Sequence, residues 1–189
     1  MLKDLVVKNR SYRRFDESVR VDEDTLRSLV DLARTAPSGM NAQGLRFRLV
    51  HTPEACARIF PMLAWAAALP EWPGPEAGER PAAYIVVLGD LQIAGNRQTD
   101  AGIAVQTMLL GAVERGLGGC ILASLRRGEL MQALGIDPER YAVQLVVALG
   151  KPAEEVRIVP VPESGDTRYW RDAAGVHNVP KHSLDELIV

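Results

Sequence analysis

The sequence is poor in residues that hold metals or form disulfides. Its 189 residues include two cysteines, Cys56 and Cys120, and three histidines, His51, His177 and His182. None of them stands at a CxxC or Cys/His spacing, which argues against zinc sites and redox dithiols. We therefore expect no metal site, and we expect both thiols to be reduced structural side chains.

Long hydrophobic runs and blocks of like charge are also missing. No apolar run approaches the roughly 18 residues that span a bilayer, and the first residues, MLKDLVVKNR, alternate charged and apolar side chains instead of forming a signal-peptide core. The formal net charge is −2, and acids and bases are interspersed, so nothing in the charge pattern suits a polyanion. The sequence predicts a cytoplasmic protein that binds neither membrane nor nucleic acid.

Several common catalytic motifs are absent. The chain has no GxGxxG after a strand, no GxxxxGK[ST], no GxSxG and no HExxH, so the classical dinucleotide-binding, P-loop, serine-hydrolase and zincin classes have no support. No nucleophile and base pair is evident either. If the chain is an enzyme, an organic cofactor is the natural carrier of its chemistry.

What is present fits one globular domain. Hydrophobic residues make up 47% and charged residues 24%, close to the average of globular chains, and the length suits a single core. Periodicity predicts helices over residues 22–36, 54–69, 100–117 and 127–134, and strands over 46–51, 82–88, 120–124 and 141–149. The helix 100–117 is apolar on more than one face, which predicts burial; a second copy of the chain is one way to supply it.

Two segments lack regular periodicity. Residues 70–81 contain EWPGPEAGERP, a proline- and glycine-rich loop that is either a functional lid or a plain connector. Trp65 and Trp72 flank this loop and suit either a planar ligand or the core. Residues 152–189 have no core of their own, and form either an arm that crosses to a partner subunit or a surface tail.

The segment NRSYRRF, residues 9–15, gathers Arg10, Ser11, Arg13 and Arg14 ahead of an apolar residue. Guanidinium groups make paired, charge-assisted bonds to phosphate oxygens, and a hydroxyl adds a donor. Alternation along the chain could aim Arg13 away from Arg14. The cluster indicates phosphate binding, although basic surface clusters without a ligand are common.

A second polar segment, APSGMNAQ, covers residues 36–43 between the first long helix and the first strand. Proline, serine, glycine and asparagine favour a loop with exposed amide and hydroxyl groups, which can recognise the polar edge of a heterocycle. An ordinary helix-to-strand turn has the same composition. The segment alone does not decide between the two.

Together these segments resemble the nitroreductase family of flavoproteins. In that family an R-x-S-x-R-x-F pattern, an A-P-S-x-x-N-x-Q loop, a long helix ending G-L-G and a C-terminal basic motif recur in this order. The counterparts here are NRSYRRF, APSGMNAQ, DAGIAVQTMLLGAVERGLGG and VPKHSLDELI. Four motifs in the same order, spread over nearly the whole chain, are more specific than any one of them.

The resemblance implies an α+β fold with a mixed, mainly antiparallel sheet flanked by helices. It also implies one domain over residues 1–189, an intertwined homodimer with FMN at the subunit interface, and an arm of about residues 152–189 that crosses to the partner. The activity that it implies is transfer of reducing equivalents from NAD(P)H to an electron-poor acceptor, such as a nitroaromatic, a quinone or a flavin, by a ping-pong mechanism. In this scheme the flavin carries the chemistry, and no side chain acts as a catalytic acid or base.

The family's cofactor-binding positions carry over residue by residue. According to the resemblance, the FMN phosphate and ribityl chain are bound by Arg10, Ser11 and Arg13. The resemblance also places Arg13 near the pyrimidine end of the ring. It places against the flavin of the other subunit Pro37, Ser38, Gly39 and Asn41. It places the backbone of Leu122, Ala123 and Ser124 near atom N5 of the flavin ring. It assigns the closing of the phosphate site to Lys181 and His182.

The sequence departs from the family pattern in three ways. Asn9 stands where the first arginine is expected, and His182 stands where the family usually has arginine, so a titratable imidazole replaces a permanent cation. Gly44 and Leu45 replace a frequent Pro-Trp pair, which changes the substrate side.

Three alternatives share part of this pattern: a flavin-binding carrier or sensor without turnover, a specialised family relative with another reductive reaction, and a dimeric interaction protein without a cofactor.

Overall fold

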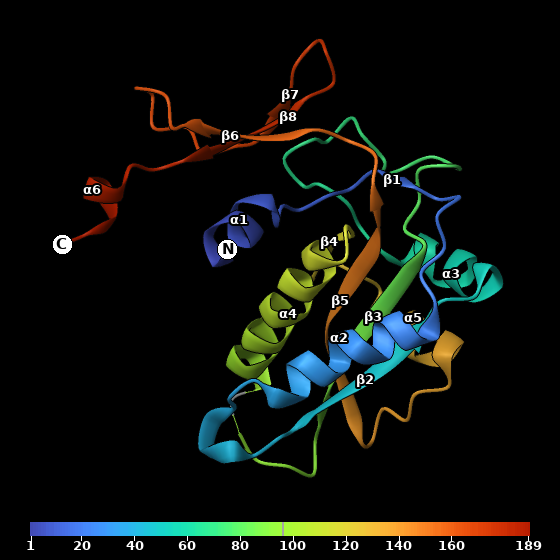
Figure 1. The fold of residues 1–189 in the computed structure, drawn as a ribbon. Coiled ribbons are helices and arrows are strands. Elements are labelled where there is room, and N and C mark those ends of the chain that lie inside the picture. Colours follow the sequence, from blue (N-terminus) through green and yellow to red (C-terminus); the bar gives the residue numbers. More distant parts are fainter. Residues whose placement is uncertain (96) are drawn as a thin grey trace.

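The computed structural model describes residues 1–95 and 97–189 (Figure 1). Its helices are α1 (Leu2–Lys8), α2 (Glu23–Thr35), α3 (Pro53–Ile59), α4 (Arg97–Glu114), α5 (Arg127–Leu134) and α6 (Leu184–Leu187), with 3-10 turns at Gly39–Asn41 and Phe60–Met62. Its strands are β1 (Phe15–Asp16), β2 (Leu45–Val50), β3 (Ala83–Asp90), β4 (Gly118–Leu122), β5 (Tyr141–Pro152), β6 (Val156–Pro160), β7 (Trp170–Arg171) and β8 (His177–Lys181).

The central sheet is antiparallel. Its strands lie in the order β2-β3-β5-β4, and β1 pairs with the last residues of β5. Strand β3 is buried along its whole length because both faces of the sheet are covered. Ile85 and Val87 face the helices α2 and α4, whereas Tyr84 and Val86 face a second cluster that includes residues of α3 and α5. This two-sided burial explains the continuous apolar run of the strand.

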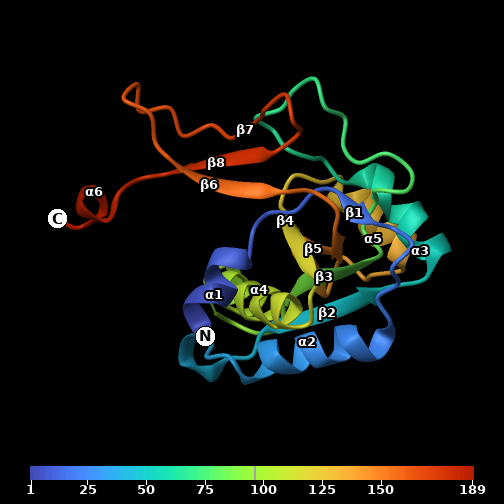
Figure 2. The ribbon, with the colours of Figure 1, turned by 45° about the horizontal axis from the view of Figure 1, so that its top comes forward.

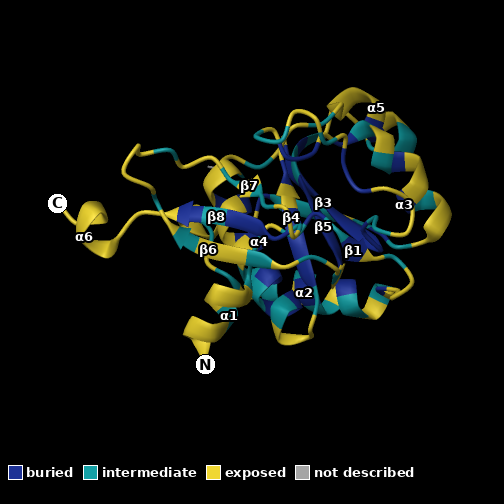
Figure 3. Cartoon of the chain, turned by 90° about the horizontal axis from the view of Figure 1, so that it is seen from above, coloured by how far each residue is buried: buried dark blue, intermediate teal, exposed yellow. Residues whose placement is uncertain are grey.

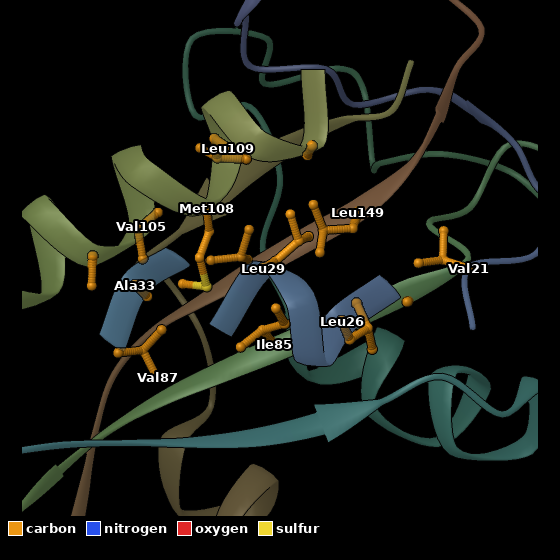
Figure 4. Close-up of a cluster of buried hydrophobic side chains, with 14 of the residues drawn as sticks. Val21, Leu26, Leu29, Ala33, Ile85, Val87, Val105, Met108, Leu109 and Leu149 are labelled. Carbon is orange, nitrogen blue, oxygen red and sulfur yellow. The ribbon is translucent and has the colours of Figure 1, made fainter. Parts of the chain in front are cut away.

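Helices α2 and α4 form the core with one face of the sheet (Figure 4). Helix α2 begins at Asp22, whose side chain accepts a hydrogen bond from the backbone N–H of Thr25 at 2.8 Å. Its apolar residues Leu26 and Leu29 fall at helical spacing and are buried under α4. The expected helix over residues 22–36 is therefore present, with Asp22 and Ala36 as its caps.

Helix α4 is displaced from its predicted range of 100–117. It begins at Arg97 and ends at Glu114, because Gly116 adopts a φ of +71° that stops the helix and turns the chain toward β4. Met108 and Ala112 are buried in the core, as expected of an apolar helix. One strip of the helix, which contains Ile103, faces outward.

The prediction of a helix over residues 54–69 was wrong beyond Met62. Helix α3 ends at Ile59, and a 3-10 turn follows to Met62. Pro61 cannot donate a backbone hydrogen bond, and Leu63 is drawn into a β-bridge with Leu125, so the chain continues in an extended form. Residues 70–81 form a loop without a helix or strand, as expected.

Residues 152–189 carry a second small sheet that periodicity did not predict. Strand β8 pairs in parallel with β6 and antiparallel with β7, which makes the fold mixed but mainly antiparallel, as expected. Figures 1 and 2 show this sheet extending away from the central body, with α6 and the C-terminus at its far end. Figure 3 shows that α6 is exposed, and none of its residues is buried.

The structure bears on the predictions about membrane-spanning helices and about the two cysteines. No helix within them is both long enough and apolar enough to cross a bilayer. Cys56 and Cys120 are free, buried thiols, as expected, and burial raises the pKa of each to about 11. Both thiols are therefore protonated at neutral pH.

Candidate functional site

The segment that contains Arg10, Ser11 and Arg13 lies against the start of β4. Ser11 forms a parallel β-bridge with Gly119, and the backbone N–H of Tyr12 donates to the Gly119 carbonyl oxygen at 3.0 Å. A Cβ atom at Gly118 would lie 2.5 Å from the Tyr12 ring. The glycines that follow α4 thus permit the close approach of the N-terminal segment.

Arg10 and Ser11 offer donors that the protein itself does not use. Arg10 Nη2 donates to the Val6 carbonyl oxygen at 2.8 Å, but its Nε is buried without a partner. Ser11 is exposed, and no hydrogen bond among residues 1–95 and 97–189 engages its hydroxyl. Arg10 keeps part of its donor capacity unused, and together with the neighbouring Ser11 hydroxyl it is a donor set that suits a phosphate monoester.

Arg13 turns inward instead of toward solvent. Arg13 is only 9% exposed. Its Nη1 donates to the Ser11 carbonyl oxygen at 3.2 Å, and its Nε is buried without a partner. Arg14 instead pairs with Glu79 through two hydrogen bonds. The two neighbouring arginines therefore serve different partners, as the alternation suggested.

Three residues of the segment 152–189 contact Arg13, and sequence analysis missed them: Glu154, Tyr169 and His177. The Arg13 guanidinium lies 4.6 Å from the centroid of the Tyr169 ring, and its Nη1 is 3.1 Å from Nε2 of His177. One carboxylate oxygen of Glu154 accepts the backbone N–H groups of Arg13 and Arg14. No motif marks these three residues, because the fold alone brings them to the N-terminal segment.

His177 is neutral in this environment. Its residue is 1% exposed, and burial, followed by the nearby Arg13 guanidinium, lowers the pKa of its imidazole to about 4. Since Arg13 can only donate, Nε2 of His177 must be the acceptor and Nδ1 must carry the proton.

The residues predicted near the flavin ring stand at the other end of β4. Leu122 is buried, whereas Ala123 and Ser124 are exposed. The Ser124 carbonyl oxygen accepts the backbone N–H of Ala64 at 3.0 Å, so the segment after α3 lies beside them. Ala123 is four positions beyond Gly119 along the extended chain, a span of about 13 Å. Strand β4 thus joins the two predicted groups.

The loop of Pro37, Ser38, Gly39 and Asn41 is exposed and strained. Met40, Asn41 and Gln43 have φ values of +53°, +52° and +50°, a region that non-glycine residues seldom adopt. Met40 is 89% exposed. The loop borders a pocket of about 430 Å³ between the end of α2, β2 and the start of α4. The pocket lining includes Ala36, Pro37, Ser38, Gln43, Leu45 and Asp100.

Within one chain, this loop and the N-terminal segment are apart. Gly39 is bonded to Asp100 near the start of α4, whereas Ser11 pairs with Gly119, which packs against Leu109. Nine residues of helix separate Asp100 from Leu109, about 14 Å along its axis. Among the described residues, no hydrogen bond joins the two segments.

Lys181 and His182 lie at the end of β8 and beyond it, and both are exposed. His182 Nδ1 is 3.4 Å from a carboxylate oxygen of Glu186 in α6. No hydrogen bond or ion pair among the described residues joins Lys181 or His182 to Arg10 or Ser11. The basic pair lies at the end of β8 from which the chain leads to α6, away from the central body (Figure 1).

Groups of three or more histidine, cysteine, aspartate or glutamate side chains suited to a metal are not found among the described residues. The donors gathered around β4 are guanidinium groups, a hydroxyl and backbone atoms. Such a set binds and orients an anionic ligand, and does not by itself make or break covalent bonds.

The sequence and the fold were compared with those of known proteins. The chain is 26% identical over 192 residues to the CLA biosynthesis enone reductase of Lactiplantibacillus plantarum, covering 82% of this chain and 87% of that protein. A Desulfovibrio desulfuricans protein, solved in complex with FMN, is 24% identical, with a TM-score of 0.72 over 100% of this chain and 95% of that one. The FMN-dependent nitroreductase of Clostridium difficile R20291 is 22% identical, with a TM-score of 0.63 over 80% and 87%.

The solved structures share the fold. The decisive match is that of the Nitroreductase family's sequence model, which covers residues 6–151, from α1 to the end of β5. This range contains the N-terminal arginine segment, the strained loop and all of β4. The chain is therefore a member of the Nitroreductase family.

Proposed function

We propose that the protein is an FMN-dependent oxidoreductase that passes reducing equivalents from NAD(P)H to an electron-poor organic acceptor. The observation that carries this proposal is the unused donor capacity of Arg10 and Ser11 beside β4, in a chain of the Nitroreductase family. FMN complexes among proteins of the same fold support the choice of cofactor.

The donor set fits FMN in three parts. The Arg10 guanidinium and the Ser11 hydroxyl would hold the phosphate, and the exposed backbone after β4, at Ala123 and Ser124, would border the ring. Arg13 would place positive charge near the pyrimidine end. Bound FMN would supply the acceptance and donation of hydride, which no side chain of this site can perform.

The proposed site is completed by a second chain. The loop of Pro37, Ser38, Gly39 and Asn41 is about 14 Å along α4 from the Arg10 segment of its own chain. An outward strip of α4 separates them, and the arm of residues 152–189 leaves the body. We propose a homodimer in which this loop serves the partner's flavin, and in which the arm brings Lys181 and His182 to a phosphate.

In this scheme the chain positions reactants and shapes the local field. Arg13 would stabilise negative charge that develops at the pyrimidine edge, and the backbone at 122–124 would orient the ring. The nicotinamide and the acceptor would occupy the same pocket in turn. Gly44 lines the pocket near the strained loop, and the Ile93 side chain lies where a Cβ atom at this position would point, so Ile93 bounds this side of the pocket.

Steady-state kinetics test the proposed activity. Initial rates with NADH or NADPH, varied against a quinone, a nitroaromatic, a flavin and an enone, should give parallel double-reciprocal lines for the accepted substrates. Intersecting lines would contradict alternate use of one pocket. A protein that binds FMN but is not reduced by either nicotinamide would instead be a flavin carrier or sensor. We further propose that the enzyme works in the cytoplasm.

A further inference from the structure

The Arg13 guanidinium is fixed by two residues of the segment 152–189. Tyr169, ahead of β7, stacks under it at 4.6 Å, and His177, the first residue of β8, meets Nη1 at 3.1 Å. The Tyr169 and His177 rings are themselves in contact, with centroids 5.0 Å apart. Arg13 therefore has one face covered and one nitrogen bonded before any ligand binds.

The backbone of Arg13 is fixed from the same side. Glu154 lies between β5 and β6, and its side chain is almost fully buried. One carboxylate oxygen accepts the N–H groups of Arg13 and Arg14, and the other pairs with Arg171 Nη2 at 3.1 Å. Arg171 in turn lies 4.1 Å from the centroid of the Trp72 ring. These contacts thus connect the N-terminal segment, through Glu154 and Arg171, to the 70–81 loop.

A positive charge so close to a buried imidazole is costly unless the imidazole stays neutral. The charged groups around His177 are Arg13, Glu154 and Arg171, and the balance of burial and these charges favours the neutral ring. A neutral imidazole presents a lone pair at a fixed point, which a protonated ring would replace with a second repelling donor. His177 is therefore suited to orient a guanidinium.

We propose that His177 is a positioning residue of the flavin site: it accepts a hydrogen bond from Arg13 and holds the guanidinium in the orientation that the cofactor meets. This inference rests on the proposed function. Its consequence is that FMN affinity depends on a residue of the C-terminal sheet that acts through Arg13. An arginine that is already oriented loses less side-chain freedom on binding.

A double-mutant cycle tests the proposal. FMN dissociation constants are measured by flavin fluorescence for the full-length wild type, His177→Leu, Arg13→Met and the double variant. We expect His177→Leu to weaken FMN binding about tenfold, the scale of one hydrogen bond to a charged group. In the Arg13→Met background the same change should alter the constant less than about twofold, because the residue through which His177 acts is gone.

Rescue separates orientation from packing. Glutamine can place an acceptor where Nε2 of His177 stands, so His177→Gln should restore most of the affinity, whereas His177→Asn is too short and should not. This pair also decides the matter if His177→Leu fails to fold. Equal losses in the wild-type and Arg13→Met backgrounds, or equal affinity of the glutamine and asparagine variants, would overturn the proposal. Wild-type protein that binds no FMN would refute the proposed function itself.

Discussion

The backbone N–H of Gly39 donates a hydrogen bond of 2.9 Å to the side chain of Asp100. Sixty-one residues separate the two in sequence, and the bond ties the strained loop to the first turn of α4. Asp100 is buried, and its charge lies at the positive end of the helix. One carboxylate therefore anchors a loop whose backbone geometry is unfavourable.

Replacing Asp100 should loosen this loop. We expect Asp100→Ala to lower the free energy of unfolding by about 1 to 3 kcal/mol, because the partly buried hydrogen bond from Gly39 is lost and the helix loses a favourable charge. Urea denaturation measures the change. Asp31→Ala is the matched control: Asp31 forms an exposed pair with Arg34, and its removal should cost less than about 1 kcal/mol. Equal losses would contradict the anchoring role.

His177 should make stability depend on pH. Its pKa is about 4 in the folded protein and near 6.5 in an unfolded chain. Because the folded-state pKa is lowered, the contribution is complete above about pH 6.5 and is lost progressively as the pH falls toward 4. Up to about 3 kcal/mol is involved.

The measurement is urea denaturation at pH 7.5 and pH 4.5 for the wild type and His177→Gln. Carboxylates titrate in both proteins, so the difference between them isolates the imidazole. The variant should lose less stability between the two pH values. Identical losses would show that His177 is not buried in its neutral form.

The two thiols should be unreactive in the native protein. Burial raises the pKa of Cys56 and Cys120 to about 11, so little thiolate exists at pH 8. A thiol-specific reagent should modify neither residue in native buffer and both in denaturant. Rapid modification of either thiol in the folded protein would contradict its burial.

Much of this fold follows from local patterns. The buried stripe of α2 and the two-sided apolar run of β3 belong to segments whose periodicity is strong. The candidate site motifs NRSYRRF and APSGMNAQ could be recognised because each is contiguous in the sequence. In contrast, Pro61 and the pairing of Leu63 with Leu125 end a helix that composition alone had extended, because tertiary contacts override weak propensity.

The contacts of Arg13 with Tyr169 and His177 could not be predicted from the sequence. Tyr169 and His177 lie in and near strands of two to five residues, too short to show alternation. Their contact with Arg13 spans 164 residues in the case of His177. Nothing local distinguishes His177 from the other histidines, since its neutrality arises from burial and from an arginine at the opposite end of the chain.

The proposed homodimer, with a flavin site shared between two chains, predicts complementation between chains. Arg13→Glu damages the N-terminal half of the site, and Gly39→Trp obstructs the loop half; each homodimer should lose FMN. A heterodimer of the two, isolated with two different affinity tags, should regain a single flavin, because one of its sites contains neither change. A heterodimer without flavin would show that each site lies within one chain.

The most direct test of the account is a titration of the purified protein with FMN, followed by the absorption spectrum. We predict that the protein retains or rebinds one FMN per chain. We also predict that Arg13→Ala weakens binding by about 1.5 to 3 kcal/mol, the value of a hydrogen bond to a charged group, and that anaerobic NAD(P)H bleaches the flavin bands of the wild type. A wild-type protein that neither retains nor rebinds FMN would contradict the central claim.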